Sequence, residues 1–258
     1  THSDGSVVIF WDVDAPATLG RMERSDSDPL RTLVPEFDAV FTYGGGDPVV
    51  DRYTALGARS CDPVYNALDP DTHFPVERDP DLVADLAFLG NRLPDREARV
   101  DRFFFDAARS VPDRRFLLGG AGWDPASLPG NVAYVGHVAP DRHNAFNCSP
   151  LAVLNVSRES MAANGYSPAT RVFEAAGAGA CLITDAWEGI ELFLEPGREV
   201  LVAADGEEVA KHLATLDRES AQMIGEAARR RICREHTYGR RAEQVEALLD
   251  ELLARRSR

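Results

Sequence analysis

The stretch 167-SPATRVFEAAGAGACLITD-185 decides how the rest of the chain is interpreted. Ser167 is a residue type favoured at helix N-caps, and Pro168 suits the first helical position because its ring presets φ. The pattern therefore predicts a helix that begins at Pro168. Gly177 and Gly179 end that helix, and the apolar run 180–184 predicts a short buried strand. Helix, tight turn and strand together are the repeating unit of α/β folds.

The first turn of this predicted helix carries groups that suit an anion. Ser167 and Thr170 supply hydroxyls, and the first N–H groups of a helix have no intrahelical partner, so they can point at a ligand. Arg171 adds a planar fork of donors that matches phosphate oxygens. Glu174, one turn further on, could accept hydrogen bonds from ribose hydroxyls. The stretch thus predicts a diphosphate site, with an ordinary capped α/β helix as the alternative interpretation.

The second half of the chain alternates strands with helices. Short apolar runs predict strands at 85–89, 115–118, 131–135, 152–156 and 200–202. Segments with helical periodicity lie between them, including a long amphipathic one at 95–108. This regular alternation predicts a parallel, doubly wound sheet with helices on both faces.

Glycines directly follow several of these predicted strands. Because glycine has no side chain, it lets backbone N–H groups approach a ligand closely, and ligands bind at the carboxyl edge of such sheets. The topology brings Ser167 and Arg171 to the same edge. The set therefore supports a nucleotide site there. The glycines are Gly90, Gly119, Gly120 and Gly136.

A shorter α/β series precedes residue 80. The apolar run 7–11 predicts a buried strand that delivers Asp12 and Asp14 to its carboxyl end. An Asp-x-Asp pair can hold a divalent cation, but a hard-cation site needs more than one carboxylate pair. The same spacing recurs by chance in this acidic chain, so no metal site is predicted. The recurrences lie at 26/28, 69/71 and 79/81.

Three consecutive glycines, 44–46, follow another predicted strand at 37–43. Strand, glycines and a helix from Pro48 form the geometry of a phosphate cradle, and a tight turn between strand and helix explains the pattern equally well. The segment 66–78 (NALDPDTHFPVER) then interrupts any periodicity with proline and aspartate. This segment is the predicted linker between two domains.

Composition and charge limit the function classes. The 258 residues carry a net charge of −14, so general nucleic-acid binding through phosphate contacts is not expected. No apolar run approaches the roughly 20 residues of a membrane span, and no basic-then-apolar leader opens the chain. We therefore expect a cytoplasmic protein without a transmembrane segment. The four scattered cysteines form no Cys-x-x-Cys pair, which predicts reduced thiols and no zinc site.

The run that begins at Ser167 resembles the donor-binding helix of GT-B glycosyltransferases. With residues 11–16 (WDVDAP) and the glycine loops, the chain is similar to the CgeB-like, spore-maturation-type group of these enzymes. The resemblance implies an α/β fold of two Rossmann-like domains with parallel sheets. The implied parts are a short or truncated acceptor-side domain at 1–78, a donor-binding domain at 79–236, and a terminal helix at 237–258 that packs back on the first domain.

The resemblance also implies the activity, a glycosyltransferase that moves a sugar from a nucleotide-diphosphate sugar to an unknown acceptor without metal or other cofactor. Asp14 is the candidate catalytic base. Retaining enzymes of this kind have two glutamates eight positions apart; Glu174 matches the second, and Tyr166 stands in the place of the first. The implied donor-binding residues are Gly90, Asn91, Arg92, Gly119, Gly120, Gly136, His137, Tyr166, Ser167, Thr170, Arg171 and Glu174.

Other functions stay open at this point. Tyr166 in the glutamate position and the short first domain favour a non-catalytic nucleotide-sugar-binding or interaction module. Epimerisation of a nucleotide sugar on the same fold would require further acids and bases around the sugar. A Rossmann dehydrogenase is disfavoured, because no Gly-x-Gly-x-x-Gly follows the first predicted strand.

Overall fold

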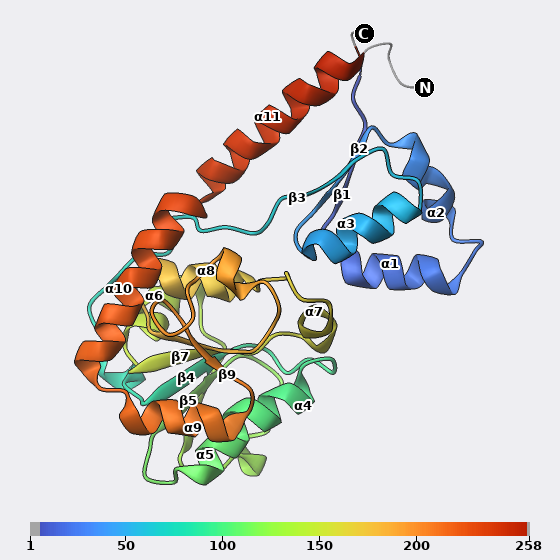
Figure 1. Ribbon diagram of the computed structural model, residues 1–258. Coiled ribbons are helices and arrows are strands. Elements are labelled where there is room, and N and C mark those ends of the chain that lie inside the picture. Colours follow the sequence, from blue (N-terminus) through green and yellow to red (C-terminus); the bar gives the residue numbers. More distant parts are fainter. Residues whose placement is uncertain (1–5, 257–258) are drawn as a thin grey trace. The chain divides into compact units, whose positions relative to one another are not determined.

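The structure, a computed structural model, describes residues 6–256, which form two compact α/β units (Figure 1). The first unit contains the described residues up to 67, the segment 160–168, and the residues from 238 onward. The second unit contains residues 68–159 and 169–237. The ends of the expected domains, residues 1–5 and 257–258, lie outside the described residues.

The first unit is built on a three-stranded parallel sheet in the order β1-β2-β3. One face is covered by α1 and α3, which bury apolar side chains such as Leu19 and Val49. On the other face, Leu252 of α11 packs against Phe41. The elements are β1 (Ile9–Asp12), α1 (Ala15–Arg24), α2 (Pro29–Leu33), β2 (Ala39–Thr42), α3 (Gly46–Ala55), β3 (Cys61–Pro63), α7 (Glu159–Asn164) and α11 (Tyr238–Arg256).

The second unit contains a six-stranded parallel sheet in the order β6-β5-β4-β7-β8-β9. Its strands are β4 (Leu86–Leu89), β5 (Phe116–Gly119), β6 (Val132–Gly136), β7 (Ala152–Asn155), β8 (Leu182–Asp185) and β9 (Leu201–Ala203). The strand order reverses between β4 and β7, and in open parallel sheets this reversal opens a crevice at the carboxyl edge. The expected α/β fold with parallel sheets is confirmed.

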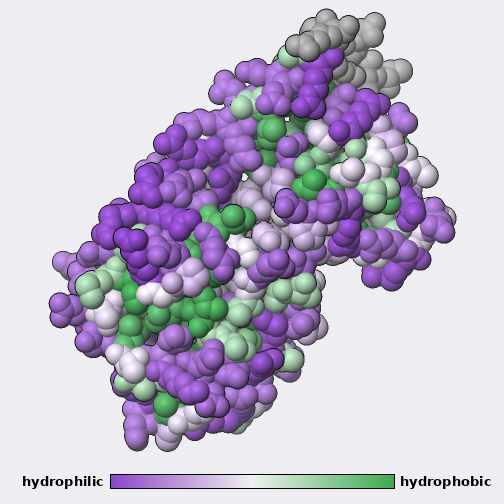
Figure 2. Space-filling view, viewed as in Figure 1, coloured by the Kyte–Doolittle hydropathy of each residue, from purple (hydrophilic) through white to green (hydrophobic). Residues whose placement is uncertain are grey.

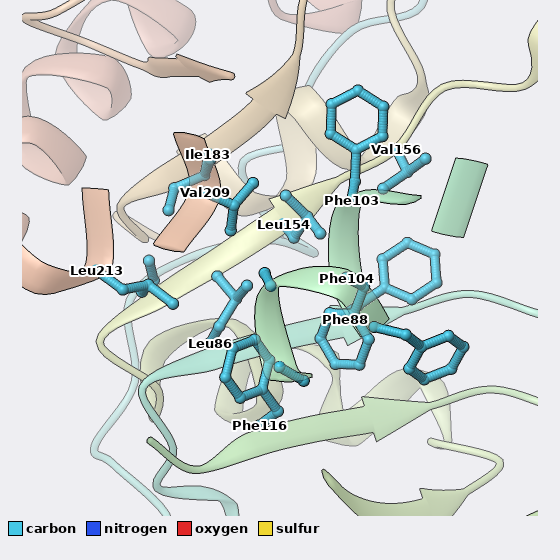
Figure 3. Packing of buried hydrophobic residues seen from close by; sticks show 14 of the residues in the cluster. Leu86, Phe88, Phe103, Phe104, Phe116, Leu154, Val156, Ile183, Val209 and Leu213 are labelled. Atoms are coloured by element: carbon cyan, nitrogen blue, oxygen red, sulfur yellow. The ribbon is translucent and has the colours of Figure 1, made fainter. Parts of the chain in front are cut away.

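Helices cover both faces of the larger sheet (Figure 1). Figure 3 shows the core on the face covered by α5 and α9, where Phe88 and Phe116 each lie within 6 Å of Phe104, measured between ring centroids (5.9 and 5.4 Å). Such tilted aromatic contacts add to the gain from burial. The helices of this unit are α4 (Glu97–Val100), α5 (Asp106–Ser110), α6 (His143–Cys148), α8 (Thr170–Gly177), α9 (Gly206–Thr215) and α10 (Arg218–Glu235).

The long helix predicted at 95–108 is not regular. Between α4 and α5 the chain widens into a π-helical turn, Asp101–Phe105. Three successive phenylalanines, 103–105, are all buried in this turn. In a regular α-helix three consecutive side chains point about 100° apart, so they cannot share one narrow stripe. The widened turn therefore accompanies the burial of a Phe-Phe-Phe run that helical periodicity alone does not predict.

Hydrophilic residues dominate the face of the molecule drawn in Figure 2, in keeping with the net charge of −14. Among the described residues, no helix combines the length and the apolar character needed to cross a membrane.

Candidate functional site

The helix predicted to begin at Pro168 begins instead at Thr170. Its N-cap is Ala169, whose backbone is extended, and no side chain caps it. Ser167 packs against the glycine turn of the first unit: a Cβ built on Gly44 would lie 3.1 Å from its Oγ. That Oγ is buried and has no hydrogen-bond partner among the described residues. The prediction that Ser167 is the N-cap is therefore wrong, because packing in the first unit holds its side chain.

Tyr166 occupies the triple-glycine turn. The N–H of Gly45 donates to the Tyr166 carbonyl at 2.7 Å, and a Cβ built on Gly46 would lie 2.6 Å from the Tyr166 ring. Tyr166 itself has a φ of 47°, a conformation rare for a residue with a side chain. Because the Gly45 donor already has a partner within the chain, the glycines serve as a tight turn between strand and helix.

In the second unit a pocket of about 330 Å³ opens at the carboxyl edge of the sheet. It includes the β4 end, where the strand order reverses. Six predicted residues line it: Gly90, Asn91, Gly120, His137, Arg171 and Glu174. The lining residues that the sequence analysis missed are Leu89, Leu93, Arg96, Val138, His143 and Asn147.

The Arg171 guanidinium is fixed in this pocket by several contacts. Its Nη2 donates to the carbonyl of Leu89, its Nη1 donates to Asn155 Oδ1 at 3.2 Å, and its Cζ lies 5.2 Å from the centre of the Phe88 ring. Burial lowers the pKa of Arg171 to about 10, and repulsion from Arg96 contributes to the same shift. A buried cation of this kind gains from a nearby anion.

Arg96 brings a second guanidinium to the same place. Its Nη2 donates to the Asn91 carbonyl at 2.6 Å, and its Cζ lies 5.6 Å from the Phe88 ring centre. A Cβ built on Gly90 would lie 2.8 Å from Arg96 Nη2 and 3.2 Å from Arg171 Nη2. The two guanidiniums therefore flank Gly90, and a side chain at this position would push them from their present places.

Glu174 is the one carboxylate among the residues that line the pocket. Its Oε1 lies 3.8 Å from His73 Nε2, and His73 Nδ1 is buried with no hydrogen-bond partner among the described residues. Two guanidiniums and one carboxylate among the lining side chains leave the pocket with a net positive charge. The pocket therefore favours a negatively charged ligand.

Several predicted donor residues do not line the pocket. Arg92 is exposed and pairs with Glu97 at 2.6 Å. Gly119 is buried in the sheet, and Thr170 is exposed at the start of α8. The residues that remain outside the lining are Arg92, Gly119, Gly136, Tyr166, Ser167 and Thr170.

Asp12 and Asp14 of the first unit have different surroundings. Asp12 is buried and accepts hydrogen bonds from Tyr53 at 2.5 Å, from Thr18 at 3.0 Å and from the Asp14 N–H at 3.0 Å. Burial and the bond to Asp12 raise the pKa of Tyr53, so its hydroxyl keeps the proton that it donates. Asp14 is half-buried at the start of α1 and makes no side-chain capping bond. Asp12 therefore has a structural role, which leaves Asp14 as the candidate base.

We expect Asp12→Ala to destabilise the first unit more than Asp14→Ala does. The Asp12 variant leaves the buried Tyr53 hydroxyl without its acceptor, which costs roughly 1–3 kcal/mol. Thermal unfolding of the two variants, followed by circular dichroism, measures the difference. Equal melting temperatures for the two would contradict the structural role of Asp12.

Two parallel sheets in separate units, with a pocket at the carboxyl edge of the larger one, define the GT-B class of fold. The fold is similar to that of Anabaena Alr3699/HepE in complex with UDP and glucose, at a TM-score of 0.70 and 14% identity over 95% of this chain and 72% of that chain. It is also similar to sucrose-phosphate synthase from Thermosynechococcus elongatus, at a TM-score of 0.69 and 15% identity over 95% and 68% of the two chains. At such identities the similarity shows the fold.

Sequence comparison gives the family. A profile of the glycosyl transferase-like family matches residues 96–247, which is more than half of the chain. The chain therefore belongs to this family. A search of curated proteins by sequence found no match. The matched region includes Arg96, Arg171 and Glu174, and it ends within α11.

Proposed function

We propose that this chain is a CgeB-like glycosyltransferase that takes its sugar from a nucleotide-diphosphate sugar. The observation that carries the proposal is the pair of guanidiniums, Arg96 and Arg171, on either side of Gly90 at the edge of the larger sheet. A diphosphate offsets the repulsion between them. It also gains negative charge as it leaves the sugar, and fixed cations stabilise that charge best when they are already in position.

In this proposal the second unit binds the donor. The diphosphate lies on Arg96 and Arg171, Glu174 accepts hydrogen bonds from ribose hydroxyls, and His137 with its loop contacts the nucleotide. The first unit forms the acceptor side, with Asp14 as the general base. The side chains that line the pocket support the roles in donor binding, since they offer donors for phosphate and a carboxylate for hydroxyls.

Binding and turnover of donors test the proposal. A ligand that binds only the folded state raises the melting temperature, and a concentration of 100 times Kd adds about 2.7 kcal/mol. We expect a rise with a nucleoside diphosphate such as UDP or GDP, and slow hydrolysis of the matching nucleotide sugar. Binding of donors without any turnover would instead favour a non-catalytic nucleotide-sugar-binding module, an alternative that Tyr166 in the glutamate position supports.

We further expect activity to persist after treatment with EDTA. We propose that the two arginines stabilise the leaving diphosphate, a role that a metal ion fills in other transferases. Hydrolysis of the nucleotide sugar, measured with and without EDTA, checks this expectation. Loss of activity that manganese restores would contradict the metal-independent mechanism.

A further inference from the structure

A chain of hydrogen bonds runs behind Arg171, away from the pocket. Asn155, Thr184 and Asp185 end the neighbouring strands β7 and β8, and all three are fully buried. Arg171 Nη1 donates to Asn155 Oδ1 at 3.2 Å, and Asn155 Nδ2 donates to Thr184 Oγ1 at 3.0 Å. The Thr184 hydroxyl in turn donates to Asp185 Oδ1 at 3.3 Å. The donors thus all run in one direction, from the guanidinium to a buried carboxylate.

The Asp185 carboxylate at the end of this chain is held from other sides. Arg99 Nη2 donates to its Oδ2 at 2.6 Å, and the N–H and hydroxyl of Ser157 donate to its Oδ1 at 3.0 and 3.2 Å. Burial of a carboxylate is costly unless a cation and hydrogen-bond donors surround it, and Asp185 has both. Asp185 is therefore a fixed acceptor, and it sets the direction of every hydrogen bond in the series that leads back to Arg171.

These hydrogen bonds allow the side-chain amide of Asn155 a single orientation. A guanidinium has only donors, so the amide oxygen must face Arg171. The amide nitrogen must then face acceptors, and it lies 3.0 Å from Thr184 Oγ1 and 3.5 Å from Asp185 Oδ1. A reversed amide would place donor against donor on one side and acceptor against acceptor on the other. Thr184 and Asp185, which lie outside the pocket, therefore hold the Asn155 amide oxygen in the position where it accepts from Arg171.

We propose that Asn155 is a positioning residue for Arg171, oriented by Thr184 and Asp185, and that it fixes the guanidinium for binding of the donor diphosphate. The inference rests on the proposed function of the pocket. With Nη2 committed to the Leu89 carbonyl and Nη1 to Asn155, the guanidinium plane is defined by two anchors and the Phe88 ring. Its remaining N–H groups are then available to an anion without further ordering, which lowers the cost of binding.

The test compares ligands that do and do not carry phosphates. In Asn155→Leu the side chain keeps a similar volume but loses the acceptor for Arg171. We expect its affinity for UDP and for inorganic pyrophosphate to fall roughly 3- to 10-fold, the range for one lost hydrogen bond, with uridine affinity unchanged. Thr184→Val, which removes only the hydroxyl that orients the amide, should give a smaller loss of the same kind. Calorimetry measures all three ligands.

Asn131→Leu is the matched control. The Asn131 amide lies in the same unit and is half-buried. It donates to the carbonyls of Ala108, Val111 and Arg114, and it does not line the pocket. Its replacement should lower the melting temperature and leave the ratio of UDP to uridine affinity at the wild-type value.

The outcomes separate the positioning role from a merely structural one. Folded Asn155→Leu protein with wild-type affinity for pyrophosphate, or with equal losses for UDP and uridine, would overturn the inference. If Asn155→Leu does not fold, Thr184→Val decides by the same criterion. Failure of the wild-type protein to bind either UDP or pyrophosphate would overturn the donor site itself, and with it this inference.

Discussion

Arg171→Ala is expected to weaken UDP binding by roughly 10- to 150-fold, which corresponds to losing a charge-assisted hydrogen bond of about 1.5–3 kcal/mol. The loss should exceed that of any other single substitution in the pocket. Arg171 combines a fixed guanidinium with a location at the reversal of strand order, next to the carboxyl end of β4. Calorimetric titration with UDP measures the effect.

The physical reason lies in the partners of Arg171 within the second unit. Its anchors are a carbonyl, an amide oxygen and an aromatic ring, and no carboxylate of the described chain reaches ion-pair distance of it. Arg96 nearby opposes its charge and lowers its pKa, although burial contributes more. A diphosphate brings negative charge directly to the guanidinium, so removal of the cation removes most of that attraction.

Arg109→Ala serves as the control for general loss of positive charge. Arg109 belongs to the same unit, is half-exposed, and pairs on the surface with Asp101 and Asp106. Surface pairs of this kind contribute little, about 0–1 kcal/mol to stability. UDP affinity should therefore stay at the wild-type value in this variant. An Arg171→Ala protein that binds UDP as tightly as Arg109→Ala would rule out Arg171 as the phosphate-binding group.

The fold could be predicted from the sequence because its signals are local and repeated. Short apolar runs that alternate with amphipathic segments specify strands and helices one after another, and parallel topology follows from the length of the connections. The helix predicted at 95–108 is present from Glu97 to Ser110, but the sequence pattern did not predict the π-helical turn in which three adjacent phenylalanines are buried. Such a widened turn depends on the shape of the core, which no short window of sequence contains.

The candidate site could be predicted only in part, because a residue's position in the sequence does not show which way its side chain points in a loop. Arg92 and Arg96 lie in one loop, and the pattern favoured Arg92; Arg96 lines the pocket, whereas Arg92 pairs with Glu97 at the surface. Ser167 has the residue type of an N-cap, but a contact with Gly44, far away in sequence, holds it elsewhere.

The second large effect is expected for Gly120→Ala, which should destabilise the second unit and weaken UDP binding together. Gly120 has a φ of 117°, and a Cβ built on it would lie 2.3 Å from the Gly90 carbonyl oxygen. The clash is with backbone, so the β4 loop must move. That loop lies between the guanidiniums of Arg96 and Arg171, and its displacement would separate the two groups that hold the diphosphate.

Gly197→Ala isolates the contribution of the backbone angle. Gly197 also has a positive φ, 81°, but a Cβ built there would meet nothing within 4 Å. Gly197→Ala should lower the free energy of unfolding only by the strain of a left-handed backbone conformation, about 1–2 kcal/mol. Gly120→Ala should cost roughly 1–3 kcal/mol more because of overpacking, at about 2–4 °C in melting temperature for each kcal/mol. Equal losses of stability in the two variants would contradict the overpacking at Gly120. Wild-type UDP affinity in folded Gly120→Ala protein would contradict the expected displacement of the β4 loop.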